Sequence, residues 1–172
     1  MDTPQHDLLL HQQSSSSIIV FSNVDCGVNI DNLKSTIDLC IYLGSNLISK
    51  STHKQKIVSR SSTKVEYHLV AVVRIKLLWI KSLLQELHIP TSIARIFSDN
   101  FGVVLSSANY VMHYKFKHIK LDLHFVRDNI QTKQISLLHI LARYQVVDPL
   151  TKPLSGFMFL TIRNSKLNPL QP

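Results

Sequence analysis

The most regular pattern of apolar and polar positions lies in the middle of the chain, over residues 62–88. Apolar side chains recur there every three or four positions, a spacing that places them on one face of a helix: Leu69, Val73, Leu77, Ile80, Leu84 and Leu87. We expect Trp79, which stands beside this repeat, to lie in the core. A hydroxyl residue among 61–63 can cap the start, and Pro90 closes the helix. The pattern predicts one long amphipathic helix.

Shorter runs of β-branched and apolar residues predict strands on both sides of this helix. They are expected at 17–25, 36–43, 47–51 (with a possible continuation to 58), 93–98 and 135–140. Further helices are predicted at 101–108, where Asp99 or Asn100 supplies the cap, and at 117–130. A short helix is expected to start at 145–150, and residues 157–167 form a final helix or tail.

The predicted order, three strands and then helices alternating with strands, defines the fold class. A meander followed by helix-linked strands gives an α/β fold, with a mixed five-stranded sheet and helices on its faces. We expect one domain at 17–155, preceded by a polar tail at 1–16 and followed by a helix or tail at 156–172. In such sheets, ligands gather at the strand ends near a switch in strand order.

The composition favours a globular domain with an anionic partner. The chain has 172 residues, 45% of them hydrophobic, and a net charge of +8, which favours nucleic acid first and a membrane surface second. A solvated basic face would explain the charge equally well. Two cysteines, Cys26 and Cys40, are too few for a disulfide framework or a zinc set, so we expect buried thiols.

No apolar run approaches the ~20 residues that span a bilayer. The N-terminal residues lack a basic region ahead of their short apolar run, so they do not resemble a secretory signal. The sequence therefore predicts no membrane segment and an intracellular protein, cytoplasmic or nuclear.

Four acidic residues stand at the predicted ends of separate elements: Asp25, Glu66, Asp99 and Asp148. Carboxylates that meet at one end of a sheet would suit Mg²⁺, which takes oxygen ligands and leaves positions open for phosphate. Two such ions could clamp the attacking and leaving oxygens of a phosphodiester.

Each acid also has a purely structural explanation. Thr63 and Glu66 have the spacing of a capping box. Asp99 can cap the next helix, Asp148 can shape a turn, and Asp25 can be a surface acid. Spacing alone leaves both interpretations open.

A run of cations precedes Glu66 with no acid among them: Lys50, Lys54, Lys56, Arg60 and Lys64. A nucleic-acid backbone could lie along this edge. The alternative is a solvated edge strand, where lysines discourage aggregation.

Several motifs occur together in an order typical of one family: VSRSSTKVEY, LLWIKSLLQELHIP, SDN, KHIKLDLHFVRDNI and QVVDPLTKPL. In this order and spacing they resemble the ribonuclease H domain of copia-type retrotransposon Pol polyproteins, over roughly residues 20–167. The resemblance implies a ribonuclease H-like fold. It also implies cleavage of the RNA strand of an RNA–DNA hybrid with Mg²⁺ or Mn²⁺, and a reverse transcriptase domain as partner in the parent polyprotein.

The resemblance also assigns site residues. The family's acidic positions fall on Asn23, Glu66, Asp99 and Asp148, three of which the spacing had already selected. His139 resembles the family's histidine, which could shuttle a proton, although a buried structural histidine is the alternative. We expect nucleic-acid contacts from Lys54, Lys56, Arg60, Ser61, Lys64 and Lys117.

Asn23 departs from the family pattern, because an amide replaces the first acid. Asn is neutral and offers one carbonyl oxygen, so it cannot bridge two cations as a carboxylate does. Asp25 lies two residues further along the same strand and points to the same face, so it could partly substitute. Other scattered departures suggest a decayed fragment. The sequence thus leaves three hypotheses: a metal-dependent ribonuclease H, an inactive relic that binds nucleic acid or a partner, and a purely structural module.

Overall fold

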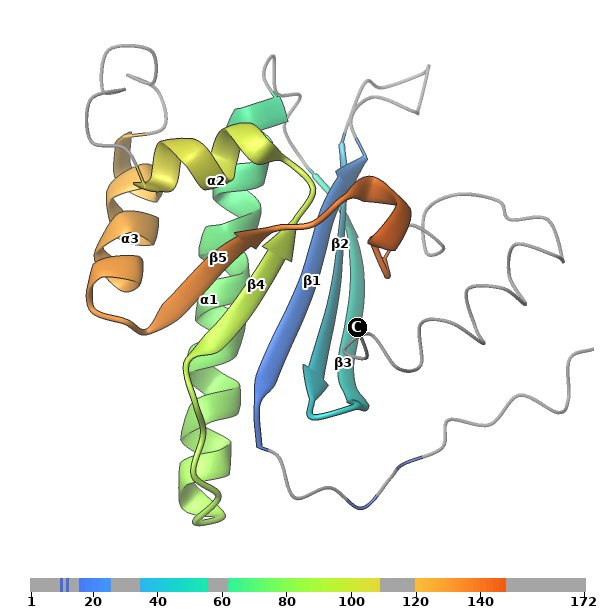
Figure 1. The fold of residues 1–172 in the computed structure, drawn as a ribbon, viewed down its shortest axis with the longest axis vertical. Coiled ribbons are helices and arrows are strands. Elements are labelled where there is room, and N and C mark those ends of the chain that lie inside the picture. The colour runs from blue at the N-terminus through green and yellow to red at the C-terminus, as the bar shows by residue number, and fades with distance from the viewer. Residues whose placement is uncertain are drawn as a thin grey trace, which may run out of the picture.

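A computed structural model describes residues 10, 12, 16–25, 35–55, 62–108 and 120–147, without the side chains of 25, 62–64, 120 and 143. Five strands form one sheet in the order β3-β2-β1-β4-β5 (Figure 1). The elements are β1 (Ile18–Asp25), β2 (Thr36–Leu43), β3 (Asn46–Lys54), α1 (Ser62–Glu86), β4 (Ala94–Ser98), α2 (Phe101–Ala108), α3 (Lys120–Gln131), β5 (Ile135–His139) and the 3₁₀ turn η3 (Ala142–Tyr144). The predicted α/β class is confirmed.

The sheet combines an antiparallel meander with parallel strands, as the order of elements predicted. Strands β1, β2 and β3 pair antiparallel, while β4 pairs parallel to both β1 and β5. Gly44 lies in the two-residue turn between β2 and β3 with φ of 60°, a conformation that glycine adopts without steric cost. Strands β1, β3, β4 and β5 therefore run in the same direction, and their carboxyl ends lie at the same end of the sheet.

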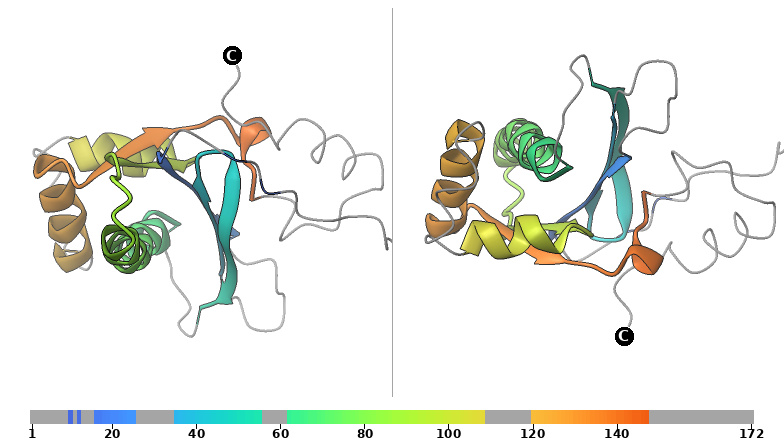
Figure 2. Two further views of the ribbon diagram at one scale, coloured as in Figure 1. Left: turned by 90° about the horizontal axis from the view of Figure 1, so that it is seen from below. Right: turned by 90° about the horizontal axis from the view of Figure 1, so that it is seen from above.

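Two apolar clusters hold the sheet, one on each face. The larger cluster joins the buried stripe of α1 to residues of α2, α3 and alternate sheet positions such as Val20, Leu39 and Ile96. The smaller cluster contains Ile19, Phe21, Cys40, Tyr42 and Val147. Figure 2 shows α1 and α3 on the first face and η3 beyond the other. Among the described residues, all three α-helices thus contribute to the same core.

The face of α1 that packs on the sheet is the predicted one, with two exceptions. Leu69, Val73 and Leu77 are fully buried. Trp79 is 69% exposed, so its assignment to the core is wrong, because two residues after Leu77 a helix has turned about 200°. Leu87 is 60% exposed, since α1 ends at Glu86 and the periodicity ends with it.

Exposed apolar side chains form a second stripe along α1, outside the core: Ile75, Leu78, Trp79 and Leu83. Next to them lies a hollow of about 440 Å³ between α1 and the strands β2 and β3, lined by Leu43, Ile48, Ser49, Lys76, Trp79, Ile80, Leu83 and Leu84.

The helix predicted to start at 145 does not form in the described part, which reaches Val147. The chain instead makes η3, and the backbone N–H of Gln145 donates to the Ala142 carbonyl. The Gln145 side chain is engaged with β1, where its Nε2 donates to the Ser22 carbonyl over 3.0 Å. The first bond closes the 3₁₀ turn, and the second ties Gln145 to β1.

Several other predictions lie outside the described residues, namely Cys26, most of the tail at 1–16, and the helix or tail at 156–172. Cys40 is a buried free thiol as expected. Within the described ranges, no helix is both long and apolar enough to cross a membrane.

Candidate active site

Glu66 lies in the second turn of α1 and points into the protein against the end of β4. Its side chain is 3% exposed, and Ser98 Oγ donates to its Oε2 over 3.4 Å. Burial, and after it the negative charge of Asp99, raises the pKa of the Glu66 carboxyl to about 8, although the Ser98 hydrogen bond acts in the other direction. Glu66 thus contacts β4, whereas the side chain of Thr63, the other half of the predicted capping box, lies outside the described part.

Asp99 follows directly on β4 and is the charge that acts on Glu66. The cap of α2 comes from its neighbour Asn100, whose Oδ1 accepts from the Val103 N–H over 3.2 Å. The Asn100 N–H in turn donates to Ser98 Oγ over 3.1 Å. Asn100 thus performs the capping role that Asp99 could have had, and Asp99 lies within electrostatic range of Glu66.

Asn23 lies on β1 at the same edge of the sheet. Its neighbour Ser22 is in register with Ser98, the last residue of β4. Asn23 follows Ser22 on β1 as Asp99 follows Ser98 in the neighbouring segment. Asn23 is 6% exposed, and Asp38, directly opposite it on β2, is fully buried. Asp38 accepts a hydrogen bond from Thr52 Oγ1 of β3 over 2.7 Å. The amide at 23 therefore has a carboxyl group as its cross-strand neighbour.

His139 ends β5 beside these residues. It is in register with Ser98 and is exposed, so the alternative of a buried histidine is wrong. Its ring contacts Phe101 edge to face, with the ring centroids 5.2 Å apart.

The remaining predicted ligands and contacts are described only in part. Asp148 lies outside the described residues. Asp25 ends β1, opposite Thr36, but its side chain is outside the described part. Lys54 is exposed at the end of β3, where it also pairs with Thr36. The side chain of Lys64, and all of Lys56, Arg60, Ser61 and Lys117, lie outside it too.

Among the described side chains, no three His, Cys, Asp or Glu residues come together in a group that could hold a metal ion. What these side chains do provide is a carboxyl pair, Glu66 and Asp99. Their mutual repulsion disfavours the doubly charged form, and a divalent cation would relieve it. Glu66 and Asp99 could therefore supply two oxygen ligands to one such ion, and water or phosphate oxygens would have to supply the others.

Three polar residues of this region were missed by the sequence analysis as site residues: Ser98, Asp38 and Gln145. Ser98 orients Glu66, and Gln145 fastens the segment after β5 to β1. Ser98 and Asp38 could have been found in the sequence, because each is a polar residue in a predicted strand at a position that the alternating pattern predicts to be buried. Gln145 carried no such signal, since its partner is a backbone carbonyl far away in the sequence.

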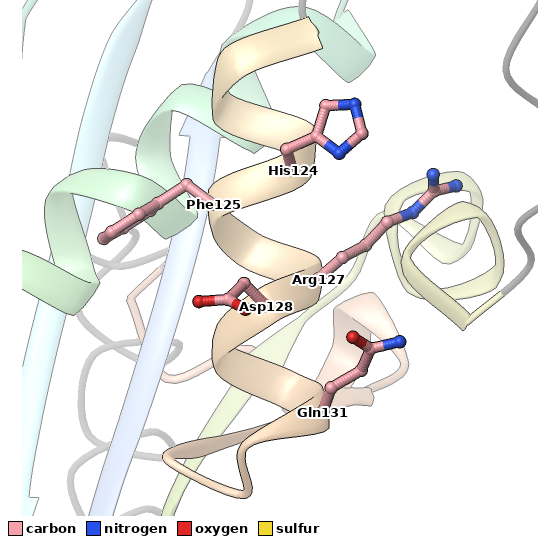
Figure 3. Close-up of a pocket in the computed structure, with 5 residues that line it drawn as sticks. All are labelled: His124, Phe125, Arg127, Asp128 and Gln131. Carbon is pink, nitrogen blue, oxygen red and sulfur yellow. The ribbon is translucent and has the colours of Figure 1, made fainter.

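A separate open hollow of about 430 Å³ lies on α3 and shares no residue with this region. His124, Phe125, Arg127, Asp128 and Gln131 line it, and Arg127 reaches toward α2 (Figure 3), where its Nη2 donates to the Ser106 carbonyl over 2.7 Å. Because that bond ties α2 to α3, Arg127 has a structural role.

Comparison with known proteins gives relatives over nearly the whole chain. The retrovirus-related Pol polyprotein from transposon RE2 of Arabidopsis thaliana is 41% identical over 158 residues, which are 91% of this chain and 11% of that protein. The corresponding polyprotein from transposon RE1 of the same plant is 40% identical over the same shares of the two chains. The chain thus spans about a tenth of the length of these relatives. No protein-family model matches it.

Two solved structures share the fold. LC11-RNase H1, isolated from compost, matches with a TM-score of 0.60 and 14% identity, over 78% of this chain and 92% of that one. LC11-RNase H1 in complex with an RNA/DNA hybrid matches with a TM-score of 0.57 and 13% identity, over 77% and 92%. The fold is that of ribonuclease H.

Proposed function

The chain belongs to the family of retrovirus-related Pol polyproteins from transposons, of which it matches one segment, and on this premise we propose that it is a ribonuclease H domain that hydrolyses the RNA strand of an RNA–DNA hybrid. The observation that carries the proposal is the pairing of Glu66 with Asp99 at the end of β4. Two carboxyl groups from separate elements influence one another there, on a fold shared with ribonucleases H.

Glu66 and Asp99 would hold a divalent cation, Mg²⁺ or Mn²⁺, and Asp148 is proposed as a further ligand. When bound, the ion would polarise a phosphodiester oxygen and lower the pKa of a bound water. Ser98 holds the Glu66 carboxyl at the strand end. His139 is exposed in the register position beside Ser98, and its imidazole is proposed to transfer a proton during hydrolysis.

Nucleic acid is the proposed partner because charge and fold agree. The net charge is +8. Lys54 is exposed at the end of the sheet where Asn23 also lies. A structure of similar fold is a complex with an RNA/DNA hybrid. We extend the basic edge to Lys56, Arg60, Ser61, Lys64 and Lys117, and propose the reverse transcriptase portion of a Pol polyprotein as the protein partner.

One observation favours a second candidate function. Asn23 brings an uncharged amide to the position where the family has its first acid, so a second cation would lack a bridging carboxylate. A domain with one cation site and a basic edge can still bind a hybrid by its phosphates. The second candidate is therefore a relic that binds nucleic acid without cleaving it. Asp25, whose side chain is outside the described part, is the proposed substitute for the missing acid.

The test is an end-labelled RNA–DNA hybrid incubated with the protein and Mg²⁺. The proposal predicts RNA fragments from the natural chain, and a loss of at least about a hundredfold in Glu66→Gln. Glu86→Gln, an exposed change at the far end of the same helix, is the matched control and should leave the rate unchanged. Salt-sensitive binding of the hybrid without RNA fragments would favour the inactive relic. Equal cleavage rates in Glu66→Gln and Glu86→Gln would show that Glu66 is not part of the active site.

A further inference from the structure

Phe101 is the first residue of α2, two positions after Asp99, and is 55% exposed. The core side of this helix is formed by other residues, Val103, Ser106 and Ser107, which are buried. The Phe101 ring packs on His139 with the ring planes at 73°, an arrangement that aromatic pairs prefer. The Phe101 ring thus contacts the His139 ring while more than half of its side chain remains exposed to solvent.

Hydrogen bonds and strand register connect this aromatic pair to the carboxyl pair. His139 lies opposite Ser98 in the parallel ladder of β4 and β5, and Ser98 Oγ donates to Glu66. The Ile140 N–H continues the ladder by donating to the Ser98 carbonyl over 3.0 Å. Figure 1 shows α2 starting where β4 ends, beside the end of β5. Phe101 and His139 therefore lie at the same end of the sheet as Ser98, the residue that contacts Glu66.

The chemistry of a hybrid defines what an exposed ring could contact there. Inside a duplex the base faces are stacked on one another, so an aromatic side chain cannot reach them without flipping a base. An RNA–DNA hybrid has A-form geometry, whose wide and shallow minor groove leaves sugars accessible. An apolar ring can pack against the carbon face of a sugar and so exclude water from it.

We infer that Phe101, braced by His139, is a platform for the sugar of the nucleotide next to the phosphate that reaches Glu66 and Asp99. This inference rests on the proposed function, since it names a contact for the same substrate. Sugar contacts fix the register of a protein on a duplex without reading its sequence. Phe101 is thus a positioning residue that sets which phosphate meets the carboxyl pair.

The experiment compares Phe101→Ala with Leu105→Ala on a hybrid of uniform sequence in Mg²⁺. Leu105 lies one turn later on the same side of α2 and is 41% exposed, so it is a matched control without the ring contact. For Phe101→Ala we expect KM to rise about tenfold with kcat within about twofold, on the scale of one buried apolar side chain, and the cleavage positions to spread over more phosphates. The KM of Phe101→Leu should lie between those of the natural chain and Phe101→Ala. Leu105→Ala should have the KM and the cleavage positions of the natural chain.

Unchanged KM and cleavage positions in Phe101→Ala would overturn the inference, as would equal effects in Leu105→Ala. Melting temperatures exclude a folding defect, and Phe101→Leu replaces Phe101→Ala if the latter is unstable. If the natural chain does not cleave, the hydrolytic proposal fails separately. Fluorescence anisotropy with the hybrid then tests the sugar contact, which predicts about tenfold weaker binding for Phe101→Ala and unchanged binding for Leu105→Ala.

Discussion

Asn23 of β1 and Asp38 of β2 face each other directly across the antiparallel ladder, and both are buried. Directly opposed side chains have Cβ atoms about 5 Å apart on the same face of a sheet. Because position 23 carries an amide, the carboxyl group of Asp38 does not face a second carboxyl group across the ladder. An acid at position 23 would stand beside Asp38 and close to the strand end that carries Asp99.

Asn23→Asp should therefore lower the stability of the cation-free protein, by about 1 kcal/mol or more, because like charges directly opposed in a sheet repel. Mg²⁺ should raise its melting temperature more than that of the natural chain, and hybrid cleavage should increase. Asn46→Asp, at the opposite end of the sheet, is the control. Equal Mg²⁺ responses in all three proteins would place position 23 outside the cation site.

Glu66→Gln should make the stability of the cation-free protein less sensitive to a rise in pH from 5 to 8. The folded-state pKa of Glu66 is about 8, above its ordinary value of 4.5, so the folded state binds more protons than the unfolded state between these two values. Stability contributed by the protonated group is present at low pH and is lost as pH rises toward 8. The free energy of unfolding of Glu66→Gln should not show this fall, whose slope in the natural chain approaches about 1.4 kcal/mol per pH unit. Urea unfolding at pH 5, 6, 7 and 8 measures it, with Glu86→Gln expected to follow the natural chain.

The two sides of α1 should respond differently to truncation at adjacent positions. Leu77 is fully buried, whereas Leu78 is 46% exposed. Leu77→Ala should cost about 2–5 kcal/mol because it leaves a cavity in the core, while Leu78→Ala should stay within about 0.5 kcal/mol. Urea midpoints give both values, and similar losses would mean that the helix is rotated about its axis.

The single tryptophan gives an independent test of the same orientation. Trp79 is 69% exposed and is the only tryptophan in the chain, so its fluorescence should show the long-wavelength emission of solvated indole. Acrylamide should quench it readily, and unfolding in urea should shift its emission little. A blue emission in the native protein that moves to the red in urea would contradict the exposed position.

The order of elements was predictable because the apolar repeats change period where the structure changes. The repeat from Leu69 through Val73 and Leu77 to Leu84 identified the buried side of α1, and all four residues are buried. Trp79 marks the limit of that reasoning. Apolar character alone does not distinguish a core residue from one on the exposed side of the same helix.

The pairing of Glu66 with Asp99 was predictable only in part. Both acids stand at element ends in the sequence, and the parallel pairing of β1 with β4 brings such ends to one edge. The contacts that define the site depend on register instead, which places Ser98 opposite His139 and Asp38 opposite Asn23. Register follows from the pairing of distant strands, and no local pattern encodes it.

The most direct test of a shared cation site is an NMR titration of the Glu66 side-chain carboxyl with and without Mg²⁺. Without the ion, the pKa of this carboxyl should be about 8, and Asp99→Asn should lower that pKa because it removes the neighbouring charge. With Mg²⁺ bound, the pKa should fall well below this value, since a cation favours the charged form. The same pKa in the presence and absence of Mg²⁺ would contradict the account.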